Sequence, residues 1–307
     1  MARPNKKHHK IPATYLENFT DSNGNLWVAD REFKIYSQTP SGLLTENDYY
    51  TIHFPDGGGT LVIETKYLGG IEGSYADLYK RKIGKFEQIT KREKATLAIF
   101  VASMMERQPM ARESLKKFFS DAEEMITHLR GLPDDVKKRA ASLPIASGSG
   151  PSISADELLE AAKDVGSLHS SLIPNTVSGT APIIFNMNFA FLVGSKDSKP
   201  FLTSDNPFTM INPIAENRWG RGTIGASPGL VQEDVEITLP LSSNVVLMCG
   251  WQYKGDCDYL PLSSELVDEI NRRTARHAGI IIGADKGMLE QIVERVKRRQ
   301  SEKQKKL

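Results

Sequence analysis

Cysteine is nearly absent from this sequence: Cys249 and Cys257 are the only two among 307 residues, and no CxxC pair occurs. This scarcity excludes a disulfide scaffold and a cysteine-rich zinc site, and it suits a reducing compartment. No apolar run approaches the ~20 residues that a membrane helix needs. The basic start of the chain is not followed by the apolar core of a signal peptide. We therefore expect a cytoplasmic protein without a membrane partner.

Several catalytic signatures are also missing. The sequence contains no GxGxxG, no P-loop lysine motif, no GxSxG elbow and no HExxH. Dinucleotide-dependent oxidoreductases, P-loop NTPases, α/β-hydrolases and zincins are therefore poor expectations. With hydrophobic residues at 39% and charged residues at 25%, the composition is that of an ordinary globular protein.

Neither positive nor negative residues predominate in the whole sequence, since the formal net charge is +1. Basic residues nevertheless gather at both ends, in residues 3–10 and 295–306. One explanation is a solvated, mobile tail from about residue 296. The other is a surface that attracts phosphate groups of nucleic acid, if the two ends meet in space.

The order of periodicities predicts an α+β protein. Two β-hairpins are expected near the start, at 26–38 and 49–63, because short β-type runs flank turn residues there. Three- and four-residue apolar spacing then predicts a central helical block over about 64–170. Thr90 with Glu93 and Ser154 with Glu157 each form a capping box that starts a helix.

The last third returns to strands. Runs at 189–193, 200–203, 235–239 and 245–249 are β-type, and helices are expected at 262–278 and 289–299. Residues 206–233, rich in Gly, Pro and Asn, are expected to be a long loop. We predict a single domain over 1–307, with N-terminal hairpins, a central helical block, and C-terminal strands and helices around one sheet.

The first twenty residues look anchored rather than free. Two adjacent histidines, His8 and His9, stand between lysines, and an apolar run at helical spacing follows: Ile11, Tyr15, Leu16 and Phe19. A disordered tail does not usually carry such a run. If the segment docks in an extended form, the two histidines point opposite ways, so that one faces a site. The alternative is a basic tail with incidental histidines.

A second polar stretch ends the 200–203 strand, where Thr203 and Ser204 lead into Asp205 and Asn206 before Pro207. Side chains at the end of a strand are held rigidly and often carry function. The competing explanation is an Asx-type turn in which Asp205 and Asn206 satisfy their own backbone.

Two charged residues of the helical block complete the candidate set. Glu72 falls within an apolar stripe, and a buried carboxylate needs an ionic partner or a cation. Arg107, at the end of the next helix, could pair with Glu72 or Asp205 in a structural ion pair. A clamp on a substrate phosphate is the alternative role for Arg107.

The motif His8-His9-x-Ile11-Pro12-x-x-Tyr15-Leu16, the Ile71-Glu72 and Arg107 segments, and Thr203-Ser204-Asp205-Asn206-Pro207 occur in this order. Together they resemble the mainly bacterial family Domain of Unknown Function 4238. The resemblance covers nearly the whole chain and favours one architectural unit over two domains. The family name carries no activity, so the resemblance groups these residues without assigning their roles.

Two functions are compatible with the grouping. In the first, His8, His9, Glu72, Arg107, Asp205 and Asn206 converge in one cleft of a nuclease-like hydrolase acting on a phosphodiester. Glu72 and Asp205 would hold a divalent cation such as Mg²⁺, His9 would act as base, and Arg107 would bind phosphate. A ribonuclease that needs no metal and uses histidine and arginine is a variant of this scheme. In the second, the same residues form a buried network that docks the N-terminal segment of a non-catalytic binding module.

Overall fold

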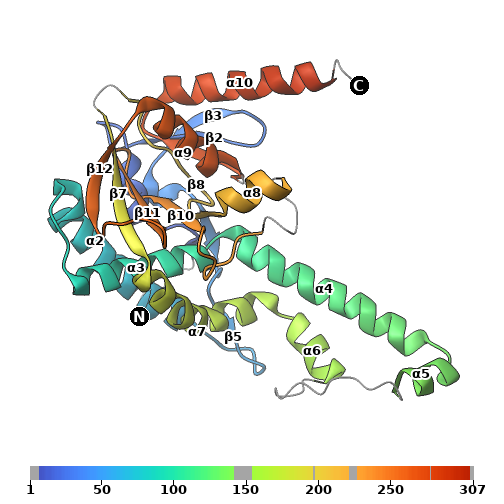
Figure 1. The fold of residues 1–307 in the computed structure, drawn as a ribbon. Coiled ribbons are helices and arrows are strands. Elements are labelled where there is room, and N and C mark those ends of the chain that lie inside the picture. The colour runs from blue at the N-terminus through green and yellow to red at the C-terminus, as the bar shows by residue number, and fades with distance from the viewer. Residues whose placement is uncertain (1–6, 142–153, 196–197, 221–226, 277, 305–307) are drawn as a thin grey trace.

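Helices and strands alternate in blocks along the computed structural model, which describes residues 7–141, 154–195, 198–220, 227–276 and 278–304. The expected α+β class is confirmed (Figure 1). No helix within these ranges is long and apolar enough to cross a membrane. The helices are α1 Ala13–Leu16, α2 Gly69–Arg81, α3 Lys91–Glu106, α4 Pro109–Gly131, α5 Asp134–Ala141, α6 Ala155–Ala162, α7 Val165–Asn186, α8 Pro213–Trp219, α9 Ser264–Arg276 and α10 Lys286–Gln304.

The strands of the described ranges form several sheets, so the expectation of one sheet is wrong. The larger two have the strand orders β12-β7-β11-β10-β9 and β3-β2-β13-β8, and β1-β4 and β5-β6 are two-stranded. The strands are β1 Lys7–His9, β2 Leu26–Ala29, β3 Ile35–Gln38, β4 Thr45–Asn47, β5 Ile52–His53, β6 Gly59–Thr60, β7 Asn188–Gly194, β8 Thr203–Ser204, β9 Thr209–Ile211, β10 Glu236–Pro240, β11 Val245–Gly250, β12 Asp258–Leu262 and β13 Ile281–Gly283. β8 is short because Pro207 follows it closely, and it pairs with β13 instead of extending the five-stranded sheet.

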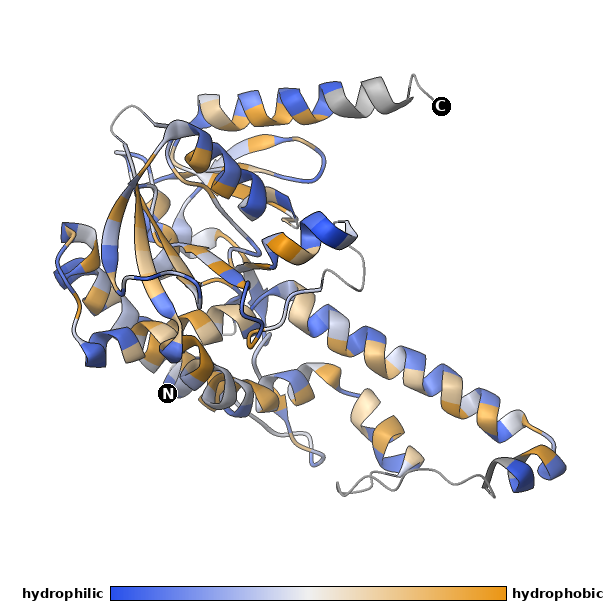
Figure 2. Ribbon diagram, in the orientation of Figure 1, coloured by the Kyte–Doolittle hydropathy of each residue, from blue (hydrophilic) through white to orange (hydrophobic). Residues whose placement is uncertain are grey.

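The five-stranded sheet is buried on both faces, which explains its apolar strands. Phe189 and Phe191 of β7 join the main core, whereas Ala190 and Leu192 pack in a second cluster with Val267 of α9. This alternation follows from the two-residue period of a strand. Figure 2 shows the apolar residues of β7, β10 and β11 between the layers of helices. The main core includes buried residues of α2, α3 and α7.

Both capping boxes are confirmed, but the helix expected at 154–170 is divided. α6 ends before Asp164, whose carboxylate accepts the N–H of Ser167 at 2.9 Å and caps the new helix α7. α7 continues to Asn186 although it contains Pro174 and Pro182. A proline removes a helix hydrogen bond; here the buried face of α7 packs against α3 and keeps the helix together.

The segment 206–233 is not a continuous loop. β9 pairs with β10, and Asn212 caps α8 by accepting the N–H of Ala215 at 2.9 Å. Sequence composition missed both elements because they are short, and residues 221–226 lie outside the described ranges. The basic residues from about residue 296 continue helix α10, which extends to Gln304. Leu289 of α10 is fully buried, in a cluster with Ala29 of β2.

Candidate functional site

The N-terminal arm, residues 7–19, is docked on the body as the sequence predicts. Its four apolar anchors, Ile11, Tyr15, Leu16 and Phe19, have no exposed surface. The Tyr15 hydroxyl lies 2.7 Å from Thr203 Oγ1 and donates to the carbonyl of Pro240 at 2.7 Å. The arm therefore does reach the Thr203–Pro207 stretch, but through Tyr15.

Arg107 follows the last residue of α3 and is only 1% exposed. Its Nε donates to the carbonyl of Lys10 at 3.1 Å, and its Nη2 donates to the carbonyl of His9. Nη1 donates to the carboxylate of Glu72. Since all three nitrogens of the guanidinium have partners, Arg107 ties the arm to α2 and α3. We call Arg107, Glu72, Glu64, Tyr50 and the backbone of residues 9–10 the Arg107 cluster.

The charge of Arg107 is stabilised by its neighbours. Burial alone would lower the pKa of the guanidinium, but Tyr50, Glu72 and Glu64 outweigh this and raise it. The guanidinium also lies 5.4 Å from the centre of the Tyr50 ring. A buried arginine with a carboxylate and two carbonyls has the geometry of a structural ion pair, one of the two roles expected for it.

The two histidines do point opposite ways. His8 is 1% exposed, and its Nδ1 accepts the N–H of Tyr50 at 2.9 Å. That bond fixes the neutral tautomer with its proton on Nε2, and burial lowers the pKa of His8. His9 is partly exposed, with Nε2 3.1 Å from the carbonyl of Ser41. His8 therefore belongs to the packed interior, and His9 to the edge of the arm.

Glu64 is a member of this cluster that sequence reasoning missed. It lies in the π-helical turn Ile63–Leu68 ahead of α2, and its Oε2 is buried without a hydrogen-bond partner among the described residues. Burial raises its pKa from 4.5 to about 6; Arg107 opposes the rise and Glu72 adds to it. The available signal was a glutamate between Ile63 and Leu68 at the point where the helical period begins.

The raised pKa of Glu64 predicts a pH-dependent stability. The native state holds the proton more tightly than the unfolded chain, so stability falls as pH rises from 4.5 to about 6. Glu64→Gln should remove this loss and be more stable than wild type above that window, by up to about 2 kcal/mol. Urea unfolding across the window checks this prediction. A difference between variant and wild type that does not change with pH would contradict it.

Asp205 and Asn206 have other surroundings. Asp205 Oδ1 accepts the N–H groups of Gly279 (2.7 Å) and Ile280 (3.2 Å), in the connection that leads into β13. Burial raises the pKa of Asp205, while those N–H groups and Arg31 oppose the rise. The backbone N–H of Asn206 donates to Ser204 Oγ at 3.1 Å, and its side chain lines a cavity.

The structure therefore brings together His8, His9, Glu72 and Arg107, and gives Asp205 and Asn206 different partners. Glu72 pairs with Arg107, whereas Asp205 accepts backbone N–H groups, so the two carboxylates proposed to bind a cation have separate partners. Within the described ranges, no group of three or more His, Cys, Asp or Glu residues has the arrangement of a metal site.

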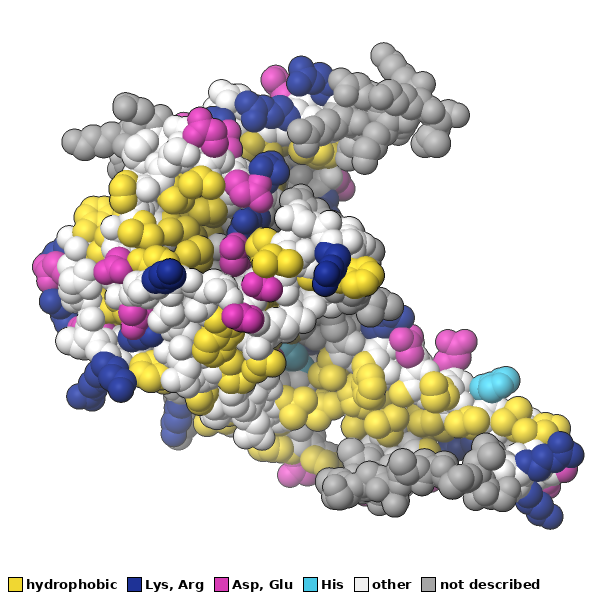
Figure 3. Space-filling model, in the orientation of Figure 1, with side chains coloured by type: hydrophobic (Ala, Val, Ile, Leu, Met, Phe, Trp, Pro, Cys, Tyr) yellow, Lys and Arg dark blue, Asp and Glu magenta, His cyan; other side chains and the backbone are white. Residues whose placement is uncertain are grey.

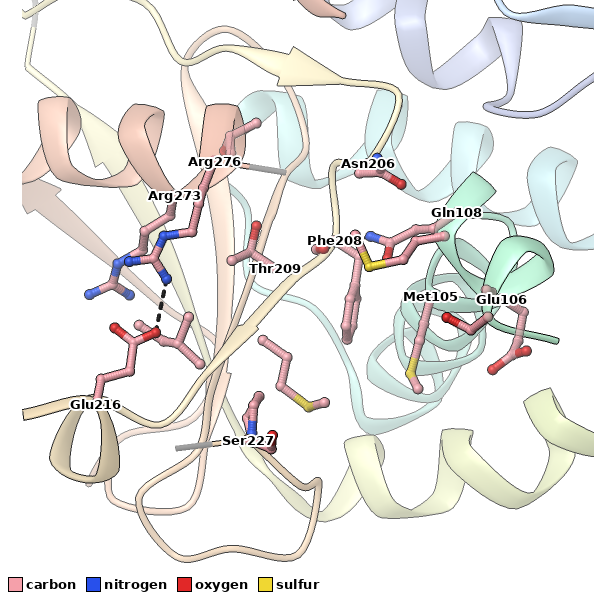
Figure 4. A pocket seen from close by; sticks show the side chains of 17 residues that line it. Met105, Glu106, Gln108, Asn206, Phe208, Thr209, Glu216, Ser227, Arg273 and Arg276 are labelled. Atoms are coloured by element: carbon pink, nitrogen blue, oxygen red, sulfur yellow. Dashed lines mark hydrogen bonds and ion pairs between the residues drawn. The ribbon is translucent and has the colours of Figure 1, made fainter. Parts of the chain in front are cut away.

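A cavity of about 780 Å³ lies beside the ends of α3 and α9. Figure 4 shows Met105, Glu106 and Gln108 on one side of it and Arg273 and Arg276 on the other. The lining residues are Met105, Glu106, Gln108, Met110, Ala111, Ser114, Asn206, Phe208, Thr209, Met210, Ile211, Glu216, Ser227, Pro228, Arg273, Thr274 and Arg276. Its size and its apolar lining with a few charged groups are those of a small-molecule site.

The arginines of this cavity are already paired with carboxylates. Arg276 Nη1 lies 2.8 Å from Glu216, and Arg273 lies 2.8 Å from Glu236 and 3.1 Å from Glu269. Opposite them, burial raises the pKa of Glu106. The lining itself holds two carboxylates, Glu106 and Glu216, and two guanidinium groups, Arg273 and Arg276. Because both guanidinium groups have carboxylate partners, the Glu106 carboxylate is available to a positively charged ligand.

His53, Asp164 and Ser167 form a surface group that resembles a catalytic triad in composition. His53 Nδ1 is 2.9 Å from Asp164 Oδ2 and 3.2 Å from Ser167 Oγ. In a working triad, the serine and the carboxylate bind opposite ring nitrogens; here both bind the same one. Burial raises the pKa of Asp164, but hydrogen bonds from Ser167 and His53 outweigh it and lower the pKa to about 2. The contact between His53 of β5 and Asp164, the N-cap residue of α7, connects β5 to the start of α7.

These features define an α+β protein with a docked N-terminal arm and a separate cavity. The chain belongs to the family described as Protein of unknown function (DUF4238), whose model matches residues 7–286. The resemblance stated from the sequence is thereby confirmed. Comparison with curated proteins and with solved structures found no match.

Proposed function

We propose that this chain is a non-catalytic binding module whose ligand site is the cavity between α3 and α9. The observation that carries the proposal is the full use of the Arg107 guanidinium by His9, Lys10 and Glu72. With every nitrogen engaged and 1% of the residue exposed, Arg107 has no free face for a phosphate. We therefore assign the polar residues of the arm a structural role, and we assign ligand binding to the cavity.

The lining of the cavity points to an amphipathic amine. The Glu106 carboxylate offers an ionic partner on one side, and among the residues that the structure describes no cation shifts its pKa. Met105, Phe208 and Met210 offer an apolar surface beside it. Methionine side chains adapt to varied apolar shapes. An ammonium group at Glu106 with its apolar body against these residues satisfies both.

Octylamine and 1-octanol test this proposal, because they differ chiefly in the charged group. We expect octylamine to bind, measured by titration calorimetry, and octanol to bind more weakly. Glu106→Gln should weaken octylamine binding about 10- to 100-fold, the worth of a hydrogen bond to a charged group. Glu113→Gln is the matched control, since Glu113 lies on α4 outside the lining and pairs with Lys116. Equal affinity in wild type and Glu106→Gln would contradict the proposal.

A hydrolase is the second candidate, and one observation favours it. The raised pKa of Glu106 in a cavity suits a general acid or base, with the side chain of Asn206 in the same lining. Hydrolysis of bis(p-nitrophenyl) phosphate, measured with Mg²⁺ and with excess chelator, tests the phosphodiester reaction. Turnover that disappears in Glu106→Gln would establish an enzyme and overturn the binding module.

Nucleic-acid binding through the basic ends remains part of this second candidate. Lys10 pairs with Glu46 at 2.7 Å, and α10 packs against β2, β3 and β13. β1, which carries Lys7, pairs with β4, whereas α10 packs against other strands. A phosphate-binding surface shared by both ends therefore rests on the charge pattern of the sequence alone. Salt-dependent retention on single-stranded DNA measures this binding directly.

A further inference from the structure

The cavity beside α3 and α9 contains an open edge of the five-stranded sheet. β9 is the last strand of that sheet; it pairs with β10 on one side and with no strand of the described ranges on the other. Thr209, Met210 and Ile211, which make up β9, all line the cavity. Neighbouring residues of a strand point to opposite faces of a sheet. A cavity that contacts three in a row therefore extends around the edge of β9.

The rest of the lining comes from both faces of the sheet. α3 contributes to the core on one face, and α9 to the apolar cluster on the other. The cavity is lined both by Glu106, at the end of α3, and by Arg273 of α9. Figure 4 shows Phe208 and Thr209 between these two sides. The cavity is thus placed where a further strand would join the sheet.

The β9 edge lacks the usual protection against a further strand. An edge strand presents N–H and C=O groups without partners, and prolines or charged residues commonly block it. β12, the opposite edge, contains Pro261, whereas β9 contains neither a proline nor a charged residue. Just before β9, the side-chain amide of Gln108 donates to the carbonyl of Phe208 at 2.5 Å. The edge therefore already accepts a donor from outside the sheet.

The charges of the cavity indicate which peptide suits this edge. On the α9 side, Arg276 pairs with Glu216 and Arg273 with Glu236. Figure 3 shows acidic and basic side chains next to one another over α8 and α9. On the α3 side, burial raises the pKa of Glu106, and no cation among the described residues opposes the rise. A lysine side chain of a bound peptide would give Glu106 an ionic partner.

We infer that the cavity binds an extended peptide, which adds to β9 as a further strand and places a lysine side chain against Glu106. This inference rests on the function proposed above and narrows its amine to a lysine within a polypeptide. A strand rises about 3.3 Å per residue, so a three-residue edge takes a segment of about three to five residues. Main-chain hydrogen bonds supply the affinity, and the contact with Glu106 supplies the selectivity.

Titration calorimetry with the peptide Thr-Val-Lys-Val-Thr, blocked at both ends, tests the inference. We expect binding at concentrations up to roughly 1 mM, a range that detects weak association. Norleucine in place of the lysine should weaken binding to wild type about 10- to 100-fold. The two peptides should bind alike to Glu106→Gln, whereas Glu113→Gln, altered outside the lining, should keep the wild-type difference. A lysine preference that persists in Glu106→Gln would contradict the contact.

Methylation of the peptide backbone tests the strand pairing. Successive residues of a strand turn their N–H groups to opposite edges. One peptide is methylated on the nitrogens of its second and fourth residues, and the other on those of its third and fifth. The peptide that loses the donors facing β9 should bind at least about tenfold more weakly than the other. Equal affinities of the two methylated peptides would overturn strand addition.

Amide hydrogen exchange separates this inference from the proposed function. The unmethylated peptide should slow exchange in β9, octylamine should not, and β12 serves as the control edge. Absence of protection in β9 would refute strand addition. Octylamine binding without peptide binding would refute the inference and leave the amine site intact. Absence of both would refute the inference and the proposed function together.

Discussion

Replacing Arg107 with leucine should destabilise the protein by about 3–5 kcal/mol, the cost of breaking a buried ion pair by removing one partner. The substitution leaves the Glu72 carboxylate and the carbonyls of His9 and Lys10 without their donors. Glu72→Gln should cost less, because its amide oxygen can still accept from Arg107. Urea unfolding followed by circular dichroism measures both changes.

Arg81→Leu is the control for this substitution. Arg81 pairs with Asp77 at 2.8 Å on the exposed side of α2. Exposed pairs of this kind contribute little, so its unfolding midpoint should stay close to wild type. If Arg107→Leu also kept the wild-type midpoint, the structural role of the Arg107 cluster would be wrong.

Replacing Tyr15 with alanine should cost about 3–5 kcal/mol, because a fully buried aromatic ring is lost from the core. The ring lies near Phe19, Tyr75 and Phe100, with centroid distances of 5.2, 6.4 and 6.1 Å. Tyr15→Phe keeps the ring and removes the hydroxyl that contacts Thr203 and Pro240. It should cost about 1–3 kcal/mol, the penalty for a buried polar group left without its partner.

The pair of Tyr15 variants separates packing from hydrogen bonding, and thermal unfolding measures both. Thr203→Val on its own should cost less than Tyr15→Phe, because the Tyr15 hydroxyl can still donate to the carbonyl of Pro240. The double variant Tyr15→Phe with Thr203→Val should cost less than the two single costs added together, since both partners of one bond are then gone. Full additivity would show that the two hydroxyls do not interact.

Local sequence signals predicted much of this fold. The capping boxes at Thr90 and Ser154 are present in the structure with both of their hydrogen bonds. The apolar run around Phe191 forms β7, an inner strand of the five-stranded sheet, and the first hairpin formed between β2 and β3. These features depend on neighbouring residues, so a sequence displays them directly.

Features that depend on distant partners were not readable in the same way. β1 pairs with β4 across more than thirty residues, and β13 lies between β2 and β8. α7 remains helical across two prolines because its buried face packs on α3. Helix propensities describe single residues and do not include such tertiary packing.

The same difference between local signals and distant partners separates the site residues that the sequence indicated from those that it missed. The sequence singled out His8, Glu72 and Arg107, which share the arm and its support, because charged or polar residues within apolar stripes need partners. It missed Glu64 and the cavity carboxylate Glu106. Their raised pKa values come from burial by residues distant in sequence, and no local motif marks such an environment.

The separation of structural cluster from ligand cavity is tested most directly by titration calorimetry of octylamine on Glu72→Gln and Glu106→Gln. The structure predicts wild-type affinity for folded Glu72→Gln, whose altered residue belongs to the Arg107 cluster. It predicts an affinity about 10- to 100-fold weaker for Glu106→Gln, whose altered residue lines the cavity. Weakened binding in Glu72→Gln with unchanged binding in Glu106→Gln would contradict the assignment of function to the cavity.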